Sequence, residues 1–151
     1  LLYLTGAQYF RFVADLYEVP ADKRNARIET YAKAFEMENA VGGLIGSMSH
    51  GMKQKVAIIA ALLHEPKLLL LDEPFVGLDP IAAHTLKQIL HELCEDGSAV
   101  FFSTHVLEVA EKLCNKIAII RQGKLLAAGD MDKVKGDQSL ESLFLELSEH
   151  A

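Results

Sequence analysis

The sequence has few cysteines, no long apolar segment and no excess of basic residues. Its two cysteines, Cys94 and Cys114, lack the spacing of metal ligands, and we expect both to be thiols of a cytosolic protein. The longest apolar run, Val56 to Leu63, has eight residues, whereas a helix needs about 20 apolar residues to cross a bilayer. The net charge of -6 argues against a nucleic-acid-binding surface, because such surfaces concentrate Lys and Arg. Any membrane association would have to come through a partner.

The sequence also lacks a phosphate-binding loop of the form Gly-x-x-x-x-Gly-Lys-Ser/Thr. Its only Gly-Lys pair, Gly123-Lys124, is followed by Leu125 and is typical of a hairpin turn. A glycine cluster at residues 42–47 follows a polar stretch rather than a strand and holds no lysine. This cluster therefore indicates a loop between helices.

Hydrophobic periodicity divides the chain into a helical part and an alternating part. The 151 residues are 50% hydrophobic, which is enough for a globular core. Apolar residues at helical spacing predict helices in the first 65 residues, and Thr5 with Gln8 predicts a capping box at the first of them. From residue 67, strands alternate with helices, which predicts a parallel sheet with right-handed crossovers. A hairpin at 117–128 is expected as an antiparallel addition. We expect a helical subdomain at 1–65, an α/β core at 66–129 and C-terminal helices at 130–151.

The run Leu68 to Leu71 ends in two adjacent carboxylates, Asp72 and Glu73, followed by Pro74. Four leucines without polar alternation predict a parallel strand that is covered on both faces. The carboxyl end of such a strand lies at the ligand crevice of an open α/β sheet. There one acid can hold Mg²⁺ through water, and the next can orient or deprotonate an attacking water. A buried strand followed by a turn without chemistry would have the same local pattern.

Three further motifs accompany the two acids. Met48 to Lys55 precedes an apolar helical run, Gly77 to Pro80 begins four residues after Glu73, and Phe101 to His105 is an apolar strand that ends in a histidine. This ordered set resembles the ATP-binding subunit of ABC transporters, over nearly the whole chain. The resemblance implies an α/β fold: a partial P-loop NTPase (RecA-like) parallel sheet flanked by helices, with an N-terminal helical subdomain. In this family the P-loop precedes the helical subdomain, so we expect the chain to be the C-terminal part of a longer domain.

The resemblance also implies roles for the residues after the Leu68 strand. Asp72 would contact Mg²⁺ through water, and Glu73 would be the general base for ATP hydrolysis. His105 would hydrogen-bond the γ-phosphate or the attacking water. Asp79, in the D-loop, would lie at a dimer interface and link two ATP sites.

Residues Ser49 to Gln54 resemble the family's signature motif. The resemblance implies that Ser49, His50, Gly51 and Gln54 bind ATP held by the P-loop of a second subunit. On local grounds, Ser49 is equally well explained as an ordinary helix N-cap. His50 stands where the family usually has glycine, and its bulky ring could donate a hydrogen bond to the partner's γ-phosphate or point away from it. We predict the direct contact.

The implied function is ATP binding and hydrolysis that power transport by a bacterial exporter-like ABC transporter. The expected partners are the P-loop half of the same domain, a second nucleotide-binding subunit in a head-to-tail dimer, and transmembrane permease subunits. The expected location is the cytoplasmic, inner face of the cell membrane, reached through the permease.

Two other functions are compatible with parts of the sequence. A soluble ABC-type ATPase acting on ribosomes or DNA would need a second ATP domain or a long coiled coil, for which the segment Leu1 to Ser49 is too short. A non-catalytic interaction module would not need Glu73 and His105, which are both present. Residues 1–151 alone are expected to be inactive, because they lack the P-loop groups that supply most of the phosphate affinity.

Overall fold

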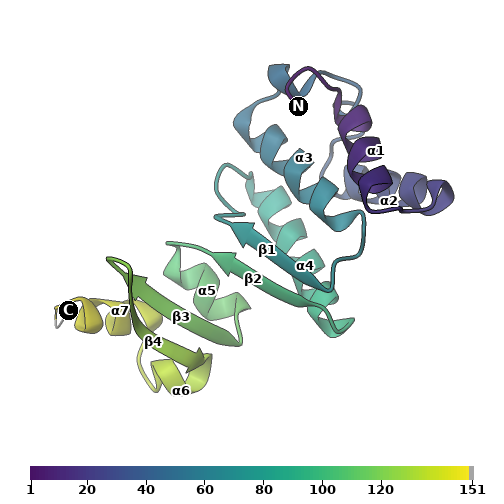
Figure 1. The fold of residues 1–151 in the computed structure, drawn as a ribbon. Helices are drawn as coiled ribbons and strands as arrows, with labels where there is room; N and C mark the ends of the chain where they lie inside the picture. Colours follow the sequence, from purple (N-terminus) through teal and green to yellow (C-terminus); the bar gives the residue numbers. More distant parts are fainter. Residues whose placement is uncertain (150–151) are drawn as a thin grey trace. The chain divides into compact units, whose positions relative to one another are not determined.

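The computed structural model describes residues 1–149, which form two compact units (Figure 1). The first unit extends from Leu1 to Ser103, and the second begins at Thr104. Within residues 1–149, no helix combines the length and the apolar character needed to span a membrane.

The first unit begins with helices that form one apolar core. They are α1 (Gly6–Leu16), α2 (Ala21–Ala34), the short 3-10 helix η1 (Ile45–Ser47) and α3 (His50–Leu62). The predicted capping box at α1 is confirmed: the Thr5 hydroxyl accepts from the Gln8 N–H at 3.1 Å, and the Gln8 side chain accepts from the Thr5 N–H at 2.9 Å. Apolar side chains from α1, α3 and the segment after α2 are almost completely buried, among them Phe10, Phe35 and Ile59. Their burial places α3 against the rest of the helical part.

A parallel pair of strands completes the first unit. Strand β1 (Leu68–Asp72) pairs in parallel with β2 (Ala99–Ser103), and helix α4 (Pro80–Glu95) makes the crossover between them and contacts β2 (Figure 1). The parallel pairing confirms the predicted strand–helix–strand pattern. The buried face of α4 carries Ala82, Leu86 and Leu90.

The prediction that both faces of the first strand are covered is wrong for the described residues. Leu69 is 5% exposed, but Leu68 and Leu70 are 57% and 65% exposed, and Phe101 on β2 is 63% exposed. Successive side chains of a strand point to opposite faces, so one face of the pair is buried and the other presents apolar side chains to solvent.

The second unit is built around an antiparallel hairpin. Its elements are α5 (Leu107–Leu113), β3 (Lys116–Arg121), β4 (Lys124–Asp130), α6 (Met131–Lys135) and α7 (Leu140–Glu149). Gln122 and Gly123 both have positive φ, +50° and +76°, as a tight two-residue hairpin turn requires. We expected this hairpin as an addition to the parallel sheet, but among the described residues β3 and β4 pair with each other in a separate two-stranded sheet. Strands joined by so short a turn satisfy each other's backbone groups directly.

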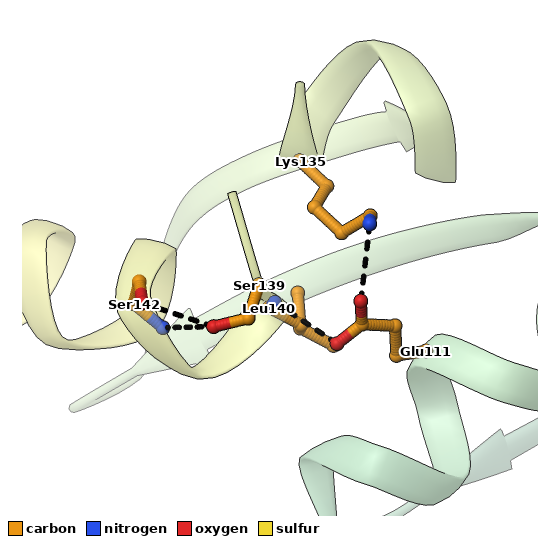
Figure 2. A network of polar contacts seen from close by, with 5 residues as sticks. All are labelled: Glu111, Lys135, Ser139, Leu140 and Ser142. Atoms are coloured by element: carbon orange, nitrogen blue, oxygen red, sulfur yellow. Dashed lines mark hydrogen bonds and ion pairs between the residues drawn. The ribbon is translucent and has the colours of Figure 1, made fainter. Parts of the chain in front are cut away.

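The start of α7 is held by a polar network, shown in Figure 2. The Leu140 N–H donates to Oε2 of Glu111 at 3.1 Å, and Lys135 Nζ lies 3.0 Å from Oε1 of the same carboxylate. The Ser139 hydroxyl accepts from the Ser142 N–H at 3.1 Å. The Leu140 N–H, and after it the Lys135 ammonium, hold the pKa of Glu111 below its ordinary value.

Candidate functional site

The first of the two acids, Asp72, is the last residue of β1, and Ser103 is the last residue of β2. The two residues are partners in the parallel register. The Ser103 hydroxyl donates a hydrogen bond to Oδ1 of Asp72, whose side chain is exposed. Ser103 therefore fixes one carboxylate oxygen of Asp72 at the carboxyl edge of the strand pair.

The second acid, Glu73, leaves the strand with a left-handed backbone, at a φ of +44°. A residue other than glycine in this region carries strain of about 1–3 kcal/mol, which surrounding contacts must offset. The Glu73 N–H donates to both the carbonyl oxygen and the hydroxyl oxygen of Ser103, each at 3.2 Å. Ser103 thus contacts both acids: it holds the carboxylate of Asp72 and the backbone of Glu73.

The first turn of α3 holds most of the predicted signature residues. The Ser49 hydroxyl accepts from the Met52 N–H at 3.3 Å, which confirms Ser49 as the N-cap of α3. The first N–H groups of a helix have no partner within the helix, and the helix dipole is positive at this end. The local structure therefore suits an anion, and the binding of a phosphate at this turn stays a prediction.

This first turn lies directly against the turn at residues 74–80. A Cβ on Gly51 would overlap the carbonyl oxygen of Gly77, so only glycine permits this approach. Gly77 has a φ of +78°, and a Cβ added to it would lie 2.6 Å from Cδ2 of His50. The exposed His50 ring therefore lies beside Gly77 of its own chain.

One helical turn further along α3, two side chains bind the same turn. The Gln54 side-chain amide donates to the carbonyl oxygen of Pro74 at 3.4 Å. Lys55 Nζ forms an ion pair with Oδ2 of Asp79 at 2.8 Å, and the Lys55 side chain is 11% exposed. The Lys55 hydrogen bond, followed by that from the Ala82 N–H, holds the pKa of Asp79 below its ordinary value.

Asp79 also begins the next helix. Its Oδ1 accepts from the Ala82 N–H at 2.8 Å, which makes Asp79 the N-cap of α4. Pro80 occupies the first position of α4, where its missing N–H would have no partner in any case. The carboxylate that pairs with Lys55 of α3 is therefore also the N-cap of α4.

The structure brings together the predicted residues of the first unit, and one further predicted residue belongs to the second unit. Those of the first unit lie on the first turns of α3, at the end of β1 and in the turn that follows it. His105 belongs to the second unit, in the segment between β2 and α5 where the Thr104 hydroxyl accepts from the Val106 N–H at 3.1 Å. Its role stays a prediction.

Two residues of this site, Ser103 and Lys55, were not predicted from the sequence. Ser103 could have been found as the polar residue that ends the strand predicted to pair with β1. Lys55 could have been found as a lysine four residues after Gly51, at the start of the apolar run of α3.

The site offers carboxylate oxygens as metal ligands, but its described residues do not form a complete set of ligands around one metal ion. Within residues 1–149, no three His, Cys, Asp or Glu side chains are grouped to hold a metal ion. The exposed Asp72 carboxylate fits Mg²⁺, which prefers oxygen ligands and usually keeps several of its waters. For the phosphates of ATP, the residues present offer the first turn of α3 and lack a P-loop.

Known proteins match this chain over most of its length. Residues 13–111 match the family described as "AAA domain, putative AbiEii toxin, Type IV TA system". The ABC-type transporter ATP-binding protein EcsA of Bacillus subtilis (strain 168) is 35% identical over 150 residues, which are 96% of this chain and 61% of EcsA. The probable multidrug ABC transporter ATP-binding protein YbhF of Escherichia coli (strain K12) is 39% identical over 130 residues, which are 84% of this chain and 22% of YbhF.

A solved structure, described as "Structure of ATP binding subunit of ABC transporter", has the same fold. It superimposes with a TM-score of 0.93 at 33% identity, and the match covers 98% of this chain and 64% of that chain. The chain thus spans less than two thirds of each of these three proteins. Because the matches extend over most of its length, the chain belongs to the ATP-binding proteins of ABC transporters, a family of P-loop NTPases.

Proposed function

We propose that the chain is part of an ATP-hydrolysing subunit of an exporter-like ABC transporter. The observation that supports this most strongly is the arrangement around Ser103, which holds the carboxylate of Asp72 and the backbone of Glu73 at the end of β1. Two acids at the carboxyl end of a parallel strand suit hydrolysis of a phosphate bond assisted by a metal ion.

In this proposal the two acids have different tasks. Asp72 holds Mg²⁺ through water, and a bound Mg²⁺ would neutralise charge that develops on the phosphates of ATP. Glu73 accepts a proton from the attacking water, a contribution that is typically about 10²- to 10⁴-fold in rate. Ser103 keeps Asp72 oriented through its hydroxyl group. His105 hydrogen-bonds the γ-phosphate or the attacking water.

The first turn of α3 serves ATP held by a second subunit. Ser49, His50, Gly51 and Gln54 line the side of a head-to-tail dimer that faces the partner's γ-phosphate, and Asp79 lies at the interface between the two ATP sites. The helix N-terminus supports this role, because its N–H groups and its dipole both favour an anion.

The proposal includes two further partners. A P-loop half of the same domain binds the phosphates and covers the exposed apolar face formed by Leu68, Leu70 and Phe101. Dimer closure driven by ATP then moves transmembrane permease subunits, which hold the protein at the cytoplasmic face of the membrane.

The variant Glu73→Gln tests the proposal in the full-length protein. It should retain ATP binding but lower turnover by roughly 10²-fold or more, because the general base is lost. Glu36→Gln is a matched control, since Glu36 is exposed and also has a left-handed backbone, with a φ of +56°. We expect this control to hydrolyse ATP normally. Near-normal steady-state hydrolysis by Glu73→Gln would assign the base to another residue.

A further inference from the structure

Lys55 is unusual for a charged residue in this protein. Among the residues that the structure describes, it is the one buried charged residue, with 9% of its surface exposed. Burial of an unpaired ammonium group is costly, so its partner has to be placed well. Asp79 supplies that partner at 2.8 Å, from a turn 24 positions later in the chain.

The ion pair connects three structural elements through one carboxylate. Oδ2 of Asp79 binds Lys55 on α3, while Oδ1 accepts from the Ala82 N–H at the start of α4. The neighbouring Gln54 binds the carbonyl oxygen of Pro74, at the other end of the same turn. Both ends of the turn 74–80 are therefore attached to adjacent positions of α3.

The close backbone approach of Gly51 to Gly77 lies between these two attachments. Gly51 is four residues before Lys55, so both face the same side of the helix. The approach leaves no room for a side chain, and it requires the turn to stay in place.

We propose that Lys55 is a positioning residue: it holds the turn 74–80 on α3 and thereby sets the positions of Glu73 and Asp79. The reaction that this positioning serves is the ATP hydrolysis proposed above, and the inference rests on that proposal for its functional consequence. Lys55 itself contacts no substrate. Its effect is to keep the Asp79 carboxylate oriented, and to keep Glu73 at a constant distance from the first turn of α3.

The first test measures hydrogen exchange of the backbone amides of residues 75–79 in the full-length protein. Lys55→Met removes the charge and keeps an unbranched chain, and we expect it to accelerate exchange in this turn by roughly fivefold or more, as for loss of an ordinary tertiary contact. Lys55→Arg keeps the charge and should restore exchange to within about twofold of the wild-type rate. Lys23→Met, at an exposed lysine of α2, should leave the turn unchanged.

A second variant tests the same ion pair in case Lys55→Met does not fold. Asp79→Asn retains a good N-cap for α4 but loses the ion pair, so it should accelerate the same amides. The double variant should exchange no faster than the faster single variant, because both substitutions remove the same interaction. Additive effects would show that Lys55 and Asp79 act independently and would overturn the proposal.

Hydrolysis measurements separate the inference from the proposed function. In the wild-type background, Lys55→Met should lower kcat with little change in KM, and Lys55→Arg should recover the activity. If the wild-type protein hydrolyses ATP and Lys55→Met leaves both exchange and kcat unchanged, the inference is wrong while the proposed function stands. If the wild-type protein does not hydrolyse ATP, the proposed function fails, and the exchange measurements still decide whether Lys55 positions the turn.

Discussion

Gly51→Ala should destabilise the protein, although alanine is the better helix former. In a helix interior, replacing glycine by alanine normally stabilises by about 0.5–1 kcal/mol. Here the added Cβ would overlap the carbonyl oxygen of Gly77, a backbone atom that moves only if the turn 74–80 moves. Overpacking of this kind costs about 1–3 kcal/mol. Because the steric cost exceeds the gain in propensity, we expect a net loss of about 1–2 kcal/mol.

The loss can be measured by urea unfolding and by thermal unfolding, both followed by far-ultraviolet circular dichroism. For a chain of 151 residues, 1 kcal/mol corresponds to about 2–4 °C, so the Tm should fall by about 2–8 °C. Gly42→Ala is the matched control, because a Cβ at Gly42 would meet no atom within 4 Å. This control should stay within about 0.5 kcal/mol of wild type.

A Gly51→Ala variant that is more stable than wild type, by the amount that helix propensity alone predicts, would refute the steric explanation. That result would mean that α3 and the turn 74–80 do not approach each other at the backbone. An equal loss in Gly42→Ala and Gly51→Ala would also contradict the steric argument.

Three further measurements test other parts of the structure. In chemical denaturation, Gly77→Ala should lower the free energy of unfolding more than Gly97→Ala. Both glycines have positive φ, but only at Gly77 would the added methyl group meet the His50 ring. The difference between the two variants should therefore shrink in a His50→Gly background. The Glu111 pKa is lowered by folding, so this group stabilises above its unfolded pKa of about 4.5, and the stabilisation is lost as pH falls through the lower folded value. Glu111→Gln should therefore flatten the acid limb of the stability curve measured between about pH 2 and 5, and an unchanged limb would count against the contact with Leu140. Finally, residues 1–151 alone should bind Mg-ATP weakly or not at all in calorimetric titration, and sub-millimolar affinity would contradict the need for a P-loop.

Several structural features were predictable because short stretches of sequence determine them. The capping box at Thr5 needs only a hydroxyl and an amide three residues apart, and both of its hydrogen bonds are present. The start of α4 at Pro80 follows from proline's fixed φ and missing N–H. The order of motifs also identified the family, because it depends on residue types and spacing alone.

Other features could not be predicted, because they depend on which segments meet in the folded chain. Ser103 binds the acids at the end of β1 from about 30 positions away, and this contact depends on the register of two strands. The position of His50 beside Gly77 depends on where the turn after β1 lies on α3, which no local pattern shows. The exposure of one apolar face of β1 could not be predicted either, since a run of leucines does not show whether one or both faces of the strand are covered.

The sequence by itself therefore determined the types and order of the helices and strands, the motifs and the family. These properties depend on interactions between residues a few positions apart, whose geometry the backbone restricts to a few forms. Tertiary structure alone decided that Lys55 is buried against Asp79, that Gly51 must lack a side chain, and that one serine holds both acids. Each of these contacts joins residues more than 20 positions apart, so each depends on the packing of α3, β1 and β2 as a whole.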